Sequence, residues 1–210
     1  MVFPGVLVSS WLLIWTKFLL QKKTIGFFMK SFQTVDARLV EKFIQMAEGA
    51  AATVEKIKGT PQNLTAALVR AMGENKFATL AETTALPSEL FAPFRDLPNV
   101  IPNPSDEQMA AVRVGVTDAF AGVAGTGSIC VAIDESLSGS VSLYSREHIA
   151  VLDARLMVSR PRDLFSGEFF ERSELPENFV FITGPSATAD MGELVRGVHA
   201  PGRLHIVLLV

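Results

Sequence analysis

Cysteine is almost absent from this sequence, because Cys130 is the only one in 210 residues. A single cysteine excludes a disulfide within the chain, and it excludes zinc and iron–sulfur sites that take four cysteines from one chain. Cys130 lies among strand-forming residues, which favours a buried and unreactive thiol. If electrons pass close to this protein, we therefore expect another protein to hold the carrier.

Histidine and excess positive charge are also scarce. The three histidines, His148, His199 and His205, are not spaced like metal ligands. The formal net charge of −3 gives no basic footprint, so we expect no nucleic-acid partner. The sequence contains no P-loop and no Ser-His-Asp arrangement. We expect no metal and no cofactor bound by this chain, and these observations argue against an independent catalytic activity without excluding one.

Residues 1–30 differ in composition from the remainder of the chain. They are uncharged up to Lys17 and contain both tryptophans. A membrane span needs about 20 apolar residues, a length that this run only just reaches, and a signal peptide would need a basic start and a small-residue cleavage site. Three interpretations stay open: a translation start placed too early, with Met29 as the true start, a membrane anchor within residues 1–23, or a signal. We treat 31–210 as a single domain.

Helical periodicity dominates the first part of this domain. Apolar residues recur at three- and four-residue steps over 34–58, which predicts a first helix that Gly59 ends. Thr60 and Pro61 provide a hydroxyl cap and a first-turn proline, and they predict a second helix that ends at Gly73. The domain is therefore expected to begin with a helical portion.

Short strands and turns alternate from residue 112 onward. Strands are predicted at 114–117, 128–133, 141–144, 148–152, 179–183 and 204–210, with a helical connection at 118–123. Strands interleaved with helices predict an α/β fold with a largely parallel sheet. The last run, 204–210, is too apolar for an exposed strand, so we expect it in the centre of the sheet. His205 alternates with apolar residues there and is expected to be a hydrogen-bonded sheet residue.

A polar turn follows the apolar run that ends at residue 183. Ser186, Thr188 and Asp190 place three oxygen-bearing side chains after Gly184, just before an expected helical turn at 191–195. Such a turn gathers free backbone amides and hydroxyls and can hold an anion. The alternative is that these residues only cap the helix. His199 lies in the next Gly/Pro loop, where it could donate a hydrogen bond to a ligand.

A second polar turn lies upstream, where Gly125 to Ser128 follow the strand predicted at 114–117. In open α/β sheets ligands bind outside the carboxyl ends of the strands, so we predict that the two turns converge on one anion-binding pocket. The alternative is that the glycines serve only tight turns. The predicted ligand-binding residues are Thr117, Thr126, Gly127, Ser128, Gly184, Ser186, Thr188, Asp190 and His199.

Two blocks of this sequence resemble those of a known family. GPSATAD followed by RGVHAPGRLHIVLL, together with VGVTDAFAGVAGTGSICV at residues 114–131, is similar to the signatures of the LUD-domain family, specifically lactate utilisation protein C. The resemblance implies a Rossmann-like fold related to coenzyme A transferases and ribose-5-phosphate isomerase. It also implies that 31–210 is one LUD domain.

The resemblance further implies a role in the oxidation of L-lactate to pyruvate. The chain would act as a cytoplasmic accessory protein beside iron–sulfur partner proteins, and it would be associated with a membrane only if residues 1–23 are an anchor. The alternatives are an enzyme acting on a phosphorylated or coenzyme A-like ligand, and a small-molecule sensor. Related sequences have an acidic residue before Thr-Gly-Thr where this chain has Gly125, which removes the natural nucleophile or base for transferase-like chemistry.

Overall fold

The computed structural model describes residues 35–73, 76–83, 85–173, 175–189, 192 and 194–210. Residues 35–210 form one compact unit. The apolar extension predicted for 1–30 lies outside the described residues. Within the described part of the chain, no helix combines the length and the apolar character that crossing a membrane requires.

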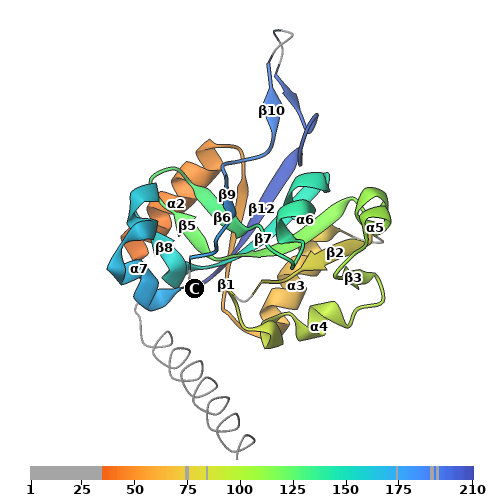
Figure 1. Cartoon of the computed structure of the whole chain (residues 1–210), viewed down its shortest axis with the longest axis horizontal. Coiled ribbons are helices and arrows are strands. Elements are labelled where there is room, and N and C mark those ends of the chain that lie inside the picture. The colour runs from red at the N-terminus through yellow and green to blue at the C-terminus, as the bar shows by residue number, and fades with distance from the viewer. Residues whose placement is uncertain (1–34, 74–75, 84, 174, 190–191, 193) are drawn as a thin grey trace, which may run out of the picture. The chain divides into compact units, whose positions relative to one another are not determined.

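Six parallel strands form the main sheet, in the order β1-β12-β7-β4-β2-β3 (Figure 1). The strands are β1 (Thr53–Ile57), β2 (Ala78–Ala81), β3 (Val100–Pro102), β4 (Val114–Ala119), β7 (Glu147–Asp153) and β12 (Arg203–Leu209). The prediction of an α/β fold with a parallel, Rossmann-like sheet is therefore confirmed. β12 pairs with β1 on one side and β7 on the other, and it is buried from Leu204 to Leu209, as expected for the last apolar run.

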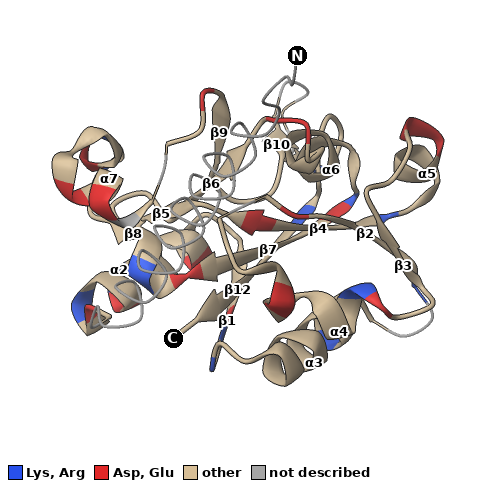
Figure 2. Cartoon of the chain, turned by 60° about the horizontal axis from the view of Figure 1, so that its bottom comes forward, with Lys and Arg blue, Asp and Glu red and all other residues tan. Residues whose placement is uncertain are grey.

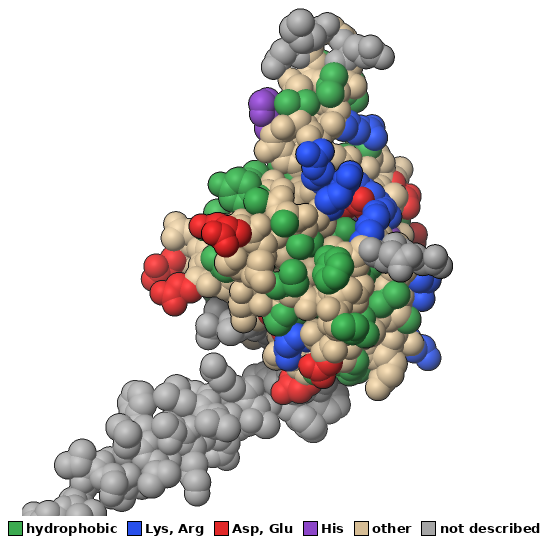
Figure 3. Space-filling model, turned by 90° about the vertical axis from the view of Figure 1, so that its right-hand side faces the viewer, with side chains coloured by type: hydrophobic (Ala, Val, Ile, Leu, Met, Phe, Trp, Pro, Cys, Tyr) green, Lys and Arg blue, Asp and Glu red, His purple; other side chains and the backbone are tan. Residues whose placement is uncertain are grey.

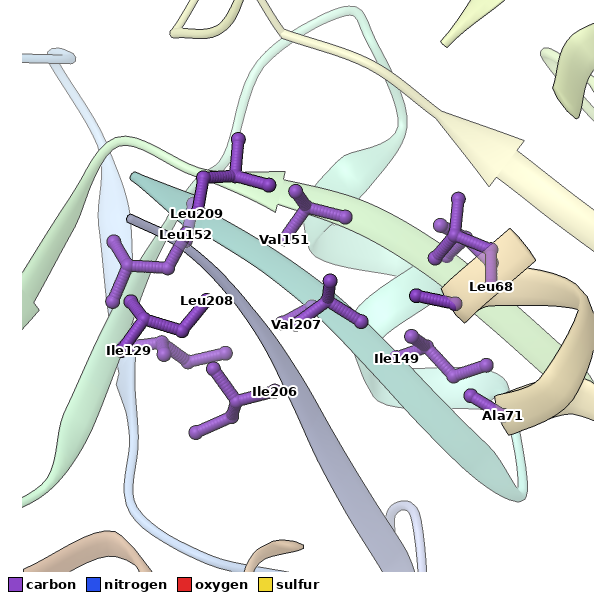
Figure 4. Close-up of a cluster of buried hydrophobic side chains, with 14 of the residues drawn as sticks. Leu68, Ala71, Ile129, Ile149, Val151, Leu152, Ile206, Val207, Leu208 and Leu209 are labelled. Atoms are coloured by element: carbon purple, nitrogen blue, oxygen red, sulfur yellow. The ribbon is translucent and has the colours of Figure 1, made fainter. Parts of the chain in front are cut away.

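The two faces of the main sheet are covered differently. Side chains alternate between the faces along a strand, so Ile149 and Leu208 lie in separate layers of the core. Leu68 and Ala71 of helix α3 (Pro61–Met72) lie next to Ile149 on one face (Figure 4). On the other face Ile129 of a second sheet lies next to Leu208 (Figure 4). Helix α6 (Ser138–Tyr144) covers the rest of that second face.

The second sheet has four strands in the order β8-β5-β6-β9. They are β5 (Ala121–Val123), β6 (Ser128–Ala132), β8 (Met157–Val158) and β9 (Phe179–Ile182), and β6 is antiparallel to both of its neighbours. Helix α2 (Ala37–Gly49) packs on this sheet, where Phe43 approaches Gly122. The second sheet and α2 thus form a layer over the main sheet.

Short helices complete the unit. They are η1 (Ser88–Leu90), α4 (Ala92–Arg95), α5 (Asp106–Ala111), η2 (Ala154–Leu156), η3 (Pro161–Phe165) and α7 (Gly167–Arg172). Figure 2 shows acidic residues on α5 and α7, two elements at opposite ends of the unit. The net negative charge is therefore distributed unevenly over the surface.

A two-stranded hairpin, β10 (Ala187–Thr188) and β11 (Val195–Arg196), projects from the body of the unit (Figure 1). We call residues 186–202, which contain this hairpin, the arm. The helix start expected at 191–195 is wrong where the structure describes it, because Val195 belongs to a strand. Its expected cap, Asp190, lies outside the described residues.

Three further predicted elements differ from the structure. The helix predicted over 34–58 ends at Gly49, Ala51 turns the chain with a φ of 66°, and 53–57 is strand β1. The helical connection predicted at 118–123 is extended instead, because its small residues let the two sheets pack closely. A Cβ on Gly122 would lie 2.6 Å from Leu152 Cδ2. The strand predicted at 141–144 is part of helix α6, which packs against β4 where Gly115 has no side chain.

Candidate functional site

Four of the nine predicted ligand-binding residues lie together in the second sheet. Thr126 Oγ1 is 2.7 Å from Ser128 Oγ, which is 2.6 Å from Thr183 Oγ1. The antiparallel pairing of β6 with β9 places Ser128 beside Thr183, so Gly127, just before Ser128, and Gly184, just after Thr183, lie at the same end of the strand pair. The first polar turn therefore contacts the strand end that precedes the second turn, through antiparallel strands of the second sheet, whereas Ser186 and Thr188 take no part in this contact.

The glycines of these turns pack against the end of helix α2. A Cβ on Gly184 would lie 2.0 Å from the carbonyl oxygen of Ala50, and one on Gly127 would lie 2.2 Å from the amide nitrogen of Ala47. Gly184 also has a φ of 69°, a conformation that other residues rarely adopt. Tight turns and close packing account for both glycines, whereas ligand binding by them stays a prediction.

Thr117 lies apart from these turns, in the interior of β4. Its Oγ1 is 2.9 Å from Nε2 of His148, and both side chains are buried. Burial lowers the pKa of His148 from 6.5 to about 4, so the ring is neutral at pH 7. The Nδ1 atom of His148 has no hydrogen-bond partner among the described residues. Thr117 therefore serves a buried polar pair.

Ser186, Thr188 and His199 belong to the arm. Thr188 pairs with Val195 in the hairpin. The amide of Ser186 donates to the carbonyl of Pro201 at 2.8 Å, and its own carbonyl accepts from Gly197 at 3.0 Å. The backbone of Ser186 thus holds the loop that contains His199. These hydrogen bonds connect the GPSATAD segment with the RGVHAPG segment.

A cleft of about 360 Å³ lies at the base of the arm, between residues 143–146 and 197–200. We call it the arm-base cleft. Of the nine predicted residues only His199 lines it. The cleft adjoins the starts of β7 and β12, at the opposite edge of the main sheet from the carboxyl ends where we expected ligands. Ser145 and Arg146, which also line it, were missed because 141–144 was expected to be a strand.

Positive charge surrounds this cleft. Glu147, the nearest carboxylate in the sequence, is 2.8 Å from Lys76 Nζ and 3.1 Å from Arg203 Nη1. Partial burial raises the pKa of Glu147, but the hydrogen bonds and charges of these two cations outweigh burial and lower it overall. Within the described residues Arg113 and Arg146 form no ion pair, and Figure 3 shows Lys and Arg side chains gathered on the face below the projecting hairpin.

A buried acid, Asp118, lies at the carboxyl end of β4, where sequence reasoning assigned no role. Asp118 accepts hydrogen bonds from the amide of Thr83 at 2.8 Å, from its hydroxyl at 2.7 Å and from the amide of Leu86 at 3.4 Å. Burial raises the pKa of Asp118 to about 6, although the hydrogen bonds oppose the shift. The donors all come from the loop after β2, so Asp118 orders that loop.

Two other sequence predictions concern His205 and Cys130. His205 Nδ1 is 2.7 Å from Thr53 Oγ1 on the neighbouring strand, which confirms a hydrogen-bonded sheet residue. Cys130 is buried in β6, and burial raises the pKa of its thiol to about 12. Among the described residues no three His, Cys, Asp or Glu side chains lie close enough to hold a metal ion.

The sequence and the fold of this chain are similar to those of a known protein family. The sequence model of the LUD domain matches residues 40–209. The uncharacterized protein NMB1437 of Neisseria meningitidis serogroup B is 28% identical over 100 residues, which span 47% of this chain and 43% of that protein. The crystal structure of a DUF162 family protein from Deinococcus radiodurans has a TM-score of 0.58 at 16% identity, covering 83% of this chain and 98% of the other. That structure supports the fold alone.

Proposed function

Because this chain belongs to the LUD domain family, which is associated with lactate utilisation, we propose that it is an accessory protein in the oxidation of L-lactate to pyruvate. It acts in the cytoplasm with iron–sulfur partner proteins, which carry the electrons. Its own contribution is to dock against a partner through the arm and to hold a small anion in a pocket.

The arm is the observation on which this proposal depends. β10 and β11 pair over only two residues each, and a hairpin of this size gains little stability from its own contacts. Its side chains nevertheless include exposed apolar residues: Leu194 is 59% exposed, Val195 46% and Val198 51%. Apolar side chains gathered on a projecting element are typical of a protein–protein contact. A partner that covers the arm would bury them.

The state of Cys130 fits an accessory role. A thiol must lose its proton to bind a metal or to attack a substrate, and burial keeps the Cys130 thiol protonated. Since this is the only cysteine in the chain, clusters that need several thiolates belong in partner proteins. We therefore expect the purified chain alone to reduce no dye when L-lactate is added.

The alternative is an enzyme acting on a phosphorylated or coenzyme A-like ligand, which the positive surroundings of the arm-base cleft favour. The geometry at Gly125 opposes it. A Cβ at this position would lie 2.7 Å from the carbonyl oxygen of Ser159, so an acidic side chain does not fit there unless the backbone moves. The chain thus offers no carboxylate at the position where related sequences have one.

Co-expression with the iron–sulfur proteins of a lactate-utilisation system tests the proposal. We expect affinity-tagged chain to copurify with a partner and the mixture to oxidise L-lactate. Val195→Asp should weaken both, because it places a charge on the apolar surface of the arm. Val69→Asp is the matched control, since Val69 is 44% exposed on α3, outside the arm. Equal copurification of both variants, or lactate oxidation by the isolated chain, would contradict this role.

A further inference from the structure

The arm-base cleft has two walls that the backbone ties together. One wall is the segment that follows α6, and the other is the loop 197–200 of the arm. The amide of Gly202 donates to the carbonyl of Arg146 at 3.0 Å, which joins them. Gly197 has a φ of 76°, and a Cβ on it would lie 3.0 Å from Gly202 Cα, so this loop closes tightly on itself. The cleft is therefore formed in advance of any ligand.

The charge in and around the cleft is positive. Arg146 lines it, and no Asp or Glu is among the described lining residues. The nearby Glu147 is engaged by Lys76 and Arg203, whereas Arg146 has no carboxylate partner in the described part of the chain. An arginine in this state keeps its planar set of donors available, and that geometry matches carboxylate and phosphate groups.

Uncharged donors line the same cleft. Within the described residues, the amides of Val198, His199 and Ala200 donate to no backbone or side-chain acceptor, and all three residues line the cleft. Ser145 lines the cleft as well, but its hydroxyl oxygen is buried against Gly115 of β4, so the donors available to a ligand are those of the loop. Successive free backbone amides are a common means of binding anions. Arg146 and the loop amides thus offer complementary donors from the two walls.

The size and the rim of the cleft limit its ligand. Its volume of about 360 Å³ is near the lower end of the range for small-molecule sites. Tyr144 and Leu143, both exposed, add apolar surface to one wall. We propose that the arm-base cleft binds the oxyanion group of a small organic acid, a carboxylate or a phosphate, with a body of only a few carbon atoms.

This inference deepens the proposed function, because a small organic acid is the substrate class of lactate oxidation. It moves the anion site away from the hydroxyl turns of the second sheet to a place where His199 is the only contribution from the predicted set. The arm would then join two events, since the same segment faces the ligand at its base and a partner protein along its exposed side.

The chain contains its own reporter for this cleft, because Tyr144 is its only tyrosine and lines the cleft. Full-length protein labelled with 3-fluorotyrosine gives one ¹⁹F resonance. The probes are sodium L-lactate, sodium pyruvate and sodium phosphate, with sodium chloride at equal ionic strength as the blank. We expect a saturable shift with at least one oxyanion and none with chloride. Tighter binding of the carboxylates or of phosphate then shows which of the two oxyanion groups the cleft prefers.

Two arginine variants distinguish a built site from a general positive field. Arg146→Gln should weaken binding at least ten-fold. Arg113→Gln, one strand end away and outside the cleft lining, should change it less than about three-fold, because exposed charges are screened by salt. No saturable shift with any oxyanion, or equal losses in both variants, would overturn the site. Anion binding that survives in Val195→Asp while copurification is lost keeps this result separate from the docking test.

Discussion

Thr117 and Asp118 are neighbours on β4 whose side chains reach two buried titratable sites on opposite faces of the main sheet. Thr117 Oγ1 lies 2.9 Å from the neutral His148 ring, and Asp118 accepts hydrogen bonds from the loop after β2. His148 and Asp118 both titrate in the acid range, but their effects on the pH dependence of stability are opposite in sign. The first two predictions depend on this opposition.

Asp118→Asn should make the protein more sensitive to acid. The pKa of Asp118 is raised from 3.8 to about 6, so the folded state binds the proton more tightly. Its contribution to stability is full below pH 3.8 and is lost as the pH rises to 6, a change of about 3 kcal/mol. In urea unfolding at pH 4, 5 and 6.5, the free energy of unfolding of wild type should rise relative to that of the variant as the pH falls. Exposed Asp134→Asn is the control, and parallel curves would contradict the prediction.

His148→Gln should have the opposite effect. The pKa of His148 falls from 6.5 to about 4, so the unfolded state binds the proton more tightly. The stability it contributes is present above pH 6.5 and is lost as the pH falls to 4, again by about 3 kcal/mol. The variant should therefore gain on wild type in acid, in the same urea series. Parallel curves for His148→Gln and wild type would contradict the prediction.

The parallel sheet could be predicted from sequence because its strands are apolar along their whole length. Leu204 to Leu209 are buried on both faces, and no other environment suits such a run. Strand β1 was missed for a related reason. Val54 and Ile57 continue the helical spacing of α2. The turn between α2 and β1 is made by Ala51, a residue type that gives no turn signal. Local pattern could not separate the two elements.

The candidate site was only partly predictable. His199 was found because Gly197 and Gly202 mark a tight loop. Arg146 was not, since its place beside that loop depends on helix α6 and on a hydrogen bond between segments over 50 residues apart. Conversely, the hydroxyls of Thr126 and Ser128 meet Thr183 through the pairing of β6 with β9 in a second sheet, which the prediction of one largely parallel sheet did not include. Sequence patterns identify turns, whereas strand order decides which turns meet.

Gly184→Ala should destabilise the fold strongly. The new Cβ would lie 2.0 Å from the carbonyl oxygen of Ala50, and the φ of 69° is unfavourable for alanine. The clash is with backbone, which cannot rotate away, so we expect a loss of at least about 2 kcal/mol in urea unfolding. Gly49→Ala is the matched control, because no atom lies within 4 Å of its Cβ position. That variant should be unchanged or up to about 1 kcal/mol more stable.

Gly125→Glu tests whether this site can regain a transferase-like carboxylate. The amide of Gly125 donates to the carbonyl oxygen of Ser159 at 2.9 Å, and the new Cβ would lie 2.7 Å from the same oxygen. The backbone must therefore move before any side chain fits, at a cost of about 1–3 kcal/mol. We expect lower stability in urea and no hydrolysis of a coenzyme A thioester. Release of thiol can be followed directly, because the buried Cys130 contributes little background.

Thr126→Glu is the matched control for that experiment. Thr126 is exposed and adjacent, so a carboxylate enters the same turn without the contact to Ser159. We expect this variant to lose at most about 1 kcal/mol of stability, because it gives up only the hydrogen bond between Thr126 and Ser128, and to be inactive as well. A Gly125→Glu protein that is as stable as wild type and cleaves the thioester would contradict the accessory role. Such a result would mean that the enzyme lacks only its nucleophile, and that the backbone at Ser159 adapts to a side chain at position 125.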